Sequence, residues 1–104
     1  MKEREPNQPA EEEPTPLFEL GQVVATQGFL DAAFRTGTNP YEYIQRHVTG
    51  DWGQLCEEDK QMNQDGLDHA GRIFSMYHLS DETKIYVITE WDRSVTTLLL
   101  PSEY

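Results

Sequence analysis

Apolar residues recur at helical spacing in two consecutive segments near the start of the chain. In residues 26–37 one stripe contains Phe29, Leu30, Ala33 and Phe34. Thr26 is the predicted N-cap of this helix, and Gly37 supplies a left-handed stop. The pattern therefore predicts a short amphipathic helix between these two residues.

The second segment, residues 39–50, shows the same features. Asn39 is the predicted N-cap, Pro40 takes the first helical position, and Gly50 is the predicted end. Its inner stripe contains Tyr43, Ile44, His47 and Val48. A third helix is predicted over residues 56–71. Its apolar content is thin, so we expect it on the surface, ending at Gly71.

After residue 71 the apolar period changes from helical to two. Residues 72–79, 84–91 and 94–101 are rich in β-branched and aromatic side chains and predict three strands. Residues 80–83 are a predicted four-residue hairpin turn, and residues 92–93 a tight one. One face of the middle strand contains Ile85, Val87, Thr89 and Trp91, and the other Tyr86, Ile88 and Glu90.

Together these elements predict an α+β fold. A three-stranded antiparallel meander is covered on one face by two or three short helices, and residues 20–25 are a candidate fourth strand at its edge. Residues 1–16 hold four of the six prolines and five glutamates. We therefore expect a disordered acidic tail there, followed by one domain over residues 17–104.

The loop after the second predicted helix places Asp51 and Trp52 between Gly50 and Gly53. We expect Trp52 to pack on the core, because an indole buries a large apolar area. Asp51 is expected to cap the turn locally.

Charge narrows the range of partners. The 104 residues carry a formal net charge of −11. The six basic residues after residue 16 are scattered, which argues against direct nucleic-acid binding, since that requires clustered Lys and Arg. An anionic surface instead favours a basic protein partner.

The single cysteine, Cys56, permits no internal disulfide and favours a reducing compartment. No apolar run reaches the length of a membrane span, and the charged, proline-rich start does not resemble a signal peptide. We expect a cytoplasmic protein that does not bind membranes.

One constellation of side chains could carry chemistry. His47 could act as a general base, Asp51 could orient it, and Arg93 could bind an anion. The remaining candidates around the same loop and the last hairpin turn are Arg46, Trp52, Glu90, Asp92 and Ser94. The structural alternative is strong, because a histidine on an apolar helix stripe is more often a core residue, and Asp-Arg-Ser is ordinary turn sequence.

Other chemistry has weaker support. Cys56 and His47 are a poor nucleophile pair, because nothing in the sequence places them together. His47, His69 and His78 lack zinc spacing, and residues 65–68 do not match a calcium loop. No phosphate loop or dinucleotide motif is present, so no cofactor is predicted.

The third predicted helix is strongly acidic. Its carboxylates could imitate the phosphates of DNA, although a solvated acidic face is the commoner explanation of such a run. The residues concerned are Glu57, Glu58, Asp59, Asp65 and Asp68.

The phrases GQVVATQG, RHVTGDWG, GRIFSMY and ITEWDRSVTTLLLPSEY resemble a family of small proteins carried on bacterial plasmids and integrative elements. The resemblance covers residues 19–104, and members are called plasmid-related proteins or, in some cases, type I restriction endonuclease subunit M. The family's recurring polar positions correspond to Arg46, His47, Asp51, Trp52, Glu90, Asp92, Arg93, Ser94 and Thr96. The resemblance names no activity.

The methylation-subunit label does not fit as an activity. An amino-methyltransferase needs a doubly wound cofactor domain, for which this chain is too short. It also needs an Asn/Asp-Pro-Pro-aromatic loop, and residues 39–43, NPYEY, lack the second proline.

Three functional hypotheses follow. The first is a non-enzymatic accessory protein of a mobile element that binds a basic protein through its acidic surface, in its sharpest version as a DNA-mimic inhibitor of a defence nuclease. The second is a small hydrolase or ligand-binding domain using the HVTGDWG loop and the EWDRS turn. The third is a structural homodimer formed through an open sheet edge.

Overall fold

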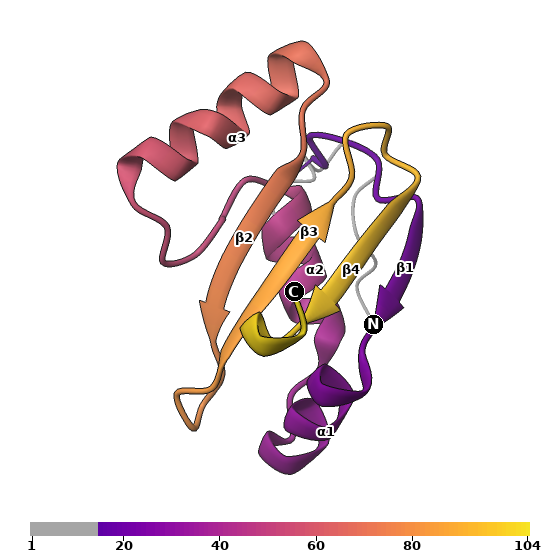
Figure 1. Cartoon of the computed structure of the whole chain (residues 1–104), viewed down its shortest axis with the longest axis vertical. Coiled ribbons are helices and arrows are strands. Elements are labelled where there is room, and N and C mark those ends of the chain that lie inside the picture. Colours follow the sequence, from indigo (N-terminus) through magenta and orange to yellow (C-terminus); the bar gives the residue numbers. More distant parts are fainter. Residues whose placement is uncertain (1–14) are drawn as a thin grey trace, which may run out of the picture.

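The computed structural model describes residues 15–104, so most of the predicted tail lies outside the described residues. These residues form a four-stranded mixed sheet with three α-helices, which confirms the α+β prediction (Figure 1). The elements are β1 (Gln22–Ala25), α1 (Gln27–Thr36), α2 (Pro40–Val48), α3 (Glu57–His69), β2 (Ile73–His78), β3 (Lys84–Thr89), β4 (Val95–Leu99) and the short 3₁₀ helix η1 (Pro101–Glu103).

The sheet has the strand order β1-β4-β3-β2. β2, β3 and β4 form the predicted antiparallel meander, with Ile73 opposite Thr89 and Val87 opposite Leu98. β1 adds to the free side of β4 in parallel, with Gln22 opposite Val95. The candidate fourth strand is therefore real, and it forms one edge of the sheet while β2 forms the other.

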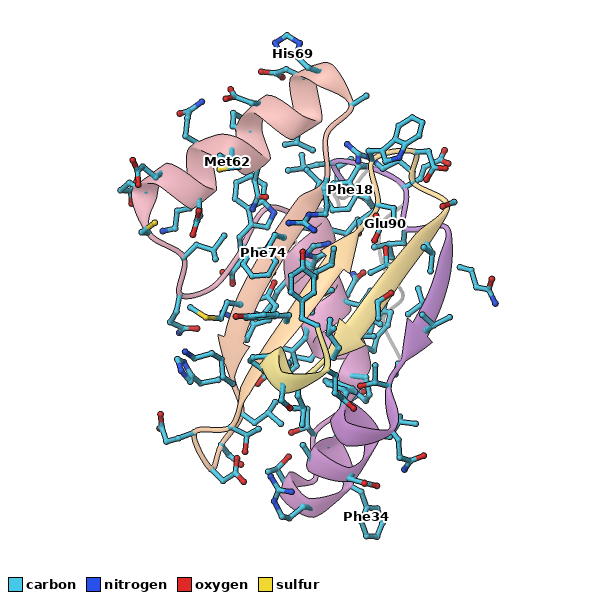
Figure 2. The ribbon with its side chains drawn as sticks, viewed as in Figure 1. Phe18, Phe34, Met62, His69, Phe74 and Glu90 are labelled. Atoms are coloured by element: carbon cyan, nitrogen blue, oxygen red, sulfur yellow. The ribbon has the colours of Figure 1, made fainter. Side chains whose placement is uncertain are left out.

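α1 and α2 cover one face of the sheet. The core on this face joins Phe29 and Ala33 of α1 to Tyr77, Ile85 and Leu98 of three strands. The predicted stripe of α1 is wrong at two positions, because Leu30 is exposed and Phe34 is 90% exposed, pointing away from the molecule in Figure 2. Ala32 is buried instead, so two small alanines allow α1 to approach the sheet closely.

The helix ends follow local sequence. The side chains of Thr26 and Asn39 accept the predicted N-cap hydrogen bonds, and Gly37 adopts the left-handed conformation that ends α1. α2 stops one residue earlier than predicted, with Thr49 as its C-cap. α3 also stops early, at a left-handed Ala70 rather than at Gly71.

α3 does not join the helical layer. It lies along the outer edge of β2 (Figure 1), and Asn63 and Gly66 are its buried residues. The expectation of a surface helix is confirmed. Its position leaves the second face of the sheet covered chiefly by η1 and the C-terminus, which lie opposite α2.

The last hairpin is longer than predicted. The Glu90 amide donates to the Val95 carbonyl and the Arg93 amide to the Glu90 carbonyl, so the turn spans residues 91–94 rather than 92–93. Arg93 takes the left-handed conformation, with φ 61°. Trp91 consequently leaves the inner face of β3 and is 64% exposed. No helix within residues 15–104 has the length and apolar character needed to cross a lipid bilayer.

Candidate functional site

The loop after α2 closes the outer edge of β2. The Met76 amide donates to the Trp52 carbonyl, and the Gln54 amide donates to the Met76 carbonyl. Gly53 lies between them at φ +81°, and a Cβ there would come within 1.9 Å of the Met76 oxygen. Glycine is therefore required by both the conformation and the close approach.

Asp51 holds this loop in place through three contacts. Its carboxylate accepts from Arg46 Nε at 2.7 Å and from the Gly53 amide, and its carbonyl accepts from the Tyr77 hydroxyl at 2.6 Å. The Arg46 hydrogen bond lowers the pKa of Asp51. Arg46 also lies over the Tyr77 ring at 4.5 Å. The predicted local cap at Asp51 is confirmed, and the pair has a structural explanation.

His47 is fully buried between α2 and the sheet. Its Nδ1 lies 2.6 Å from Ser75 Oγ, and its Nε2 lies 2.9 Å from Thr89 Oγ1. Thr89 Oγ1 is in turn 2.7 Å from Thr96 Oγ1, which donates to the Leu20 carbonyl. One polar chain thus crosses the core from β2 to the segment before β1.

The direction of this chain fixes the histidine tautomer. Because Thr96 gives its proton to a carbonyl, it must accept from Thr89, and Thr89 must accept from His47 Nε2–H. Burial keeps the ring neutral, so His47 Nδ1 accepts from the Ser75 hydroxyl. Burial, aided by the positive charge of Arg93, lowers the pKa of His47 to about 3. The buried ring has no access to solvent and therefore cannot reach a substrate.

Arg93 is committed to backbone carbonyls. Its guanidinium donates to the carbonyls of Gly71 at 2.6 Å, Gly66 at 3.1 Å and Glu90 at 3.2 Å. It therefore joins the β3–β4 turn to the last turn of α3. It also lies over the Phe18 ring, which packs edge-on against His47.

The remaining candidate residues around the loop and the last hairpin turn do not lie together. Asp92 accepts from the Ser94 amide within the exposed turn, and the half-buried Glu90 lies at the end of β3 (Figure 2). Trp52 packs with Leu55 and Ile73 in a small second core, as expected. Arg46 and Asp51 meet each other, His47 lies in the core, and Arg93 binds α3, so these side chains do not converge on one cavity.

Other candidate ligands are also apart. Cys56 is exposed at the start of α3 and makes no side-chain cap hydrogen bond, while His47 is buried. Residues 15–104 contain no group of three or more His, Cys, Asp or Glu side chains arranged to hold a metal ion.

A groove lies elsewhere, between α3 and the face of the sheet opposite α2. Its volume is about 590 Å³. The floor is formed by Phe74 and Tyr86, and the walls by Met62 of α3 and Tyr104 at the C-terminus (Figure 2 labels Met62 and Phe74). Asp59, Asn63, Asp65, Gly66, His69, Gly71 and Arg72 complete the lining.

Three aromatic rings form a row along this groove. The Phe74 and Tyr86 centroids are 4.7 Å apart at 67°, and those of Tyr86 and Tyr104 are 6.1 Å apart at 85°. Arg72 lies over the Tyr104 ring at 5.6 Å and donates to its hydroxyl. Edge-to-face pairs of this kind stabilise the row.

Asn63 fixes the position of the α3 wall. Its side-chain amide donates to the Phe74 carbonyl at 2.7 Å, and its carbonyl oxygen accepts from the Phe74 amide at 2.9 Å. These two bonds satisfy the outward backbone groups of Phe74, next to those of Met76 that the loop reaches. The edge of β2 and the groove wall are therefore built by the same residue.

The acidic candidates of α3 lie on the groove side and the solvent side of this helix. Glu57, Glu58, Asp65 and Asp68 are exposed and Asp59 is half-buried. Glu57 has an ion pair with Lys60 at 3.7 Å. Sequence reasoning found these residues but missed the groove beside them. The exposed Met62 in the acidic helix was the one local signal of it.

No protein-family model, curated protein or solved structure matches this chain. The candidate site therefore rests on its own geometry.

Proposed function

We propose that this protein is a non-enzymatic interaction protein that binds a basic partner protein through the acidic surface of α3. The supporting observation is an imbalance of charge. α3 presents Glu58, Asp65 and Asp68 to solvent, and the ion pair recorded on this helix within residues 15–104 is the one between Glu57 and Lys60.

Two of the arginines among the described residues are paired with acids away from α3, and the two beside α3 are fewer than the acids of this helix. Arg35 pairs with Asp81 and Arg46 with Asp51, while Arg93 binds carbonyls and Arg72 binds Tyr104. The formal charge of the whole chain is −11. Such a field attracts basic partners and raises their association rate, most strongly at low salt.

The sharper form of the proposal is mimicry of DNA toward a defence nuclease. α3 has thirteen residues and is therefore about 20 Å long, with carboxylates at both ends. A basic DNA-binding surface that accepts phosphates could accept these groups. The resemblance to proteins carried on plasmids and integrative elements supports this setting.

The test measures binding of a fluorescent lysine decapeptide by anisotropy between about 20 and 300 mM NaCl. We expect the affinity to fall steeply with salt. In the triple variant Glu57→Gln, Glu58→Gln, Asp68→Asn it should fall at least tenfold at low salt. The matched control Glu19→Gln, Glu42→Gln, Glu82→Gln removes the same charge elsewhere and should lose less than threefold. Equal losses in the two variants would leave α3 with no special role.

Mimicry has its own test. Proteins captured on the immobilised chain from a bacterial lysate are eluted with duplex DNA at constant salt. Release of a bound nuclease by DNA supports mimicry, provided that the same nuclease also binds to the control variant. A partner that DNA does not displace rejects mimicry while leaving the acidic-surface proposal in place.

A further inference from the structure

We infer that the groove between α3 and the face of the sheet opposite α2 receives an aromatic side chain from a lysine- or arginine-rich segment of the partner. This inference rests on the proposed function and specifies its site. Its occupant is a basic peptide segment with one aromatic residue, and the argument combines three properties of the groove.

The first property is exposed apolar surface around a built floor. Met62 is 68% exposed and Tyr104 is 67% exposed, and both line the groove above Phe74 and Tyr86. Contiguous exposed apolar surface, unlike single scattered apolar side chains, marks binding grooves and interaction sites. The volume of about 590 Å³ lies within the usual range for ligand sites.

The second property is the chemistry of the walls. Phe74, Tyr86 and Tyr104 are stacked edge to face, an arrangement that a further ring can extend. Met62 supplies a flexible, polarisable thioether, which contacts aromatic rings favourably and adapts to their shape. An aromatic side chain contacts the row of rings and the Met62 thioether more favourably than an aliphatic side chain does.

The third property is the charge of the rim. Asp59 and Asp65 border the groove, and Glu57, Glu58 and Asp68 continue the acidic surface along α3. The one arginine at the rim, Arg72, lies over the Tyr104 ring and donates to its hydroxyl. Cationic residues on either side of the aromatic one would meet these carboxylates. Because the acids extend beyond the groove, an extended segment fits them better than a small molecule.

The test compares two acetylated peptides, Lys-Lys-Lys-Trp-Lys-Lys-Lys and the same peptide with Ser in place of Trp. Binding to the full chain is followed by amide NMR shifts. We expect the Trp peptide to bind at least tenfold more tightly. The extra shifts should fall on residues 62, 74, 86 and 104, whereas the Ser peptide should shift only the acidic positions of α3.

Met62→Glu separates the groove from plain charge attraction. The added carboxylate would strengthen binding of both peptides if attraction alone operated. If the aromatic residue enters the groove, the variant loses the tenfold preference for Trp. Met62→Leu keeps the apolar wall and should retain the preference. Met62 is exposed, so neither change should disturb folding, which circular dichroism checks.

The outcomes separate this inference from the proposed function. Equal, salt-sensitive binding of both peptides overturns the groove and leaves the acidic-surface function standing. Failure of both peptides to bind overturns both. A Trp preference that survives in Met62→Glu also overturns the groove as the site.

Discussion

At the scale of residues, His47 shows what polar side chains do in this small core. Its position on the inner stripe of α2 follows from the sequence, and its burial confirms that placement. Its partners Ser75 and Thr89 could not be predicted, because they come from different strands and meet only through the sheet register. A histidine that resembled a general base is thus a structural residue.

Burial of His47 gives stability a defined pH dependence. Its pKa is about 3 in the folded chain against about 6.5 in an unfolded chain. Between these values the unfolded state binds one more proton than the folded state. The contribution of His47 to the free energy of unfolding is therefore complete above pH 6.5. It is lost as the pH falls below that value, by about 1.4 kcal/mol per pH unit.

Urea unfolding of the wild type and His47→Gln between pH 7.5 and 4.5 measures this effect. We expect the wild type to be more stable at pH 7.5, and the difference between the two proteins to narrow as the pH falls. The acidic residues titrate in both proteins and cancel in the comparison. NMR of the ring nitrogens should show an Nε2-protonated neutral His47 at pH 5. A difference in stability that stays constant with pH would contradict the low pKa.

At the scale of elements, what the sequence predicted well was local. The side chains of the caps Thr26 and Asn39 accept from amides two or three residues away, so these caps can be predicted from neighbouring residues in the sequence. The stripe of α1 failed because Leu30 and Ala32 both fit helical spacing. Packing against the sheet decides which of the two is buried, because a small residue fits where α1 approaches the sheet closely.

The groove could not be predicted either, because its residues come from segments that are far apart in the sequence. Its floor comes from β2 and β3, one wall from α3 and the other from Tyr104. No short motif joins these segments. The acidic run on α3 was predicted, but the aromatic row beside it exists only after the sheet pairs and the chain end folds back over it.

The loop that closes the edge of β2 gives a prediction about Gly53. In Gly53→Ala the new Cβ would meet the Met76 oxygen, so the loop must leave β2 and expose its outer backbone groups. Gly37→Ala is the matched control, since Gly37 is also left-handed, at φ +68°, with nothing within 4 Å of the added Cβ. The control should lose about 1–2 kcal/mol, the cost of the left-handed conformation alone.

Urea unfolding compares the two variants. We expect Gly53→Ala to lose about 2 kcal/mol more than Gly37→Ala, because the two hydrogen bonds between the loop and Met76, each worth about 1 kcal/mol net, are lost as well. Hydrogen exchange should show faster exchange of the Met76 amide in this variant alone. Similar losses in the two proteins would mean that the loop is not needed at the sheet edge.

At the scale of the whole molecule, the two sheet edges are treated differently. β2 is covered by the Trp52–Gln54 backbone and by Asn63, whereas β1 is a four-residue strand whose Val23 and Val24 are 41% and 37% exposed. An exposed edge strand is a template for pairing with a second copy. Among residues 15–104, β1 is therefore the candidate surface for the homodimer hypothesis, and charge opposes this pairing.

We expect the chain to be a monomer of 12.0 kDa by light scattering at about 50 μM in 20 mM NaCl. Two copies that each carry −11 repel at low salt, and four residues supply few interstrand hydrogen bonds. In 500 mM NaCl the Debye length falls to a few ångströms, so any pairing through β1 should appear there first. Val23→Lys, which places a charge on that edge, should abolish such pairing. A mass of twice 12.0 kDa at low salt would show that a second copy binds despite the repulsion, and the acidic surface would then have to be reassessed in the dimer.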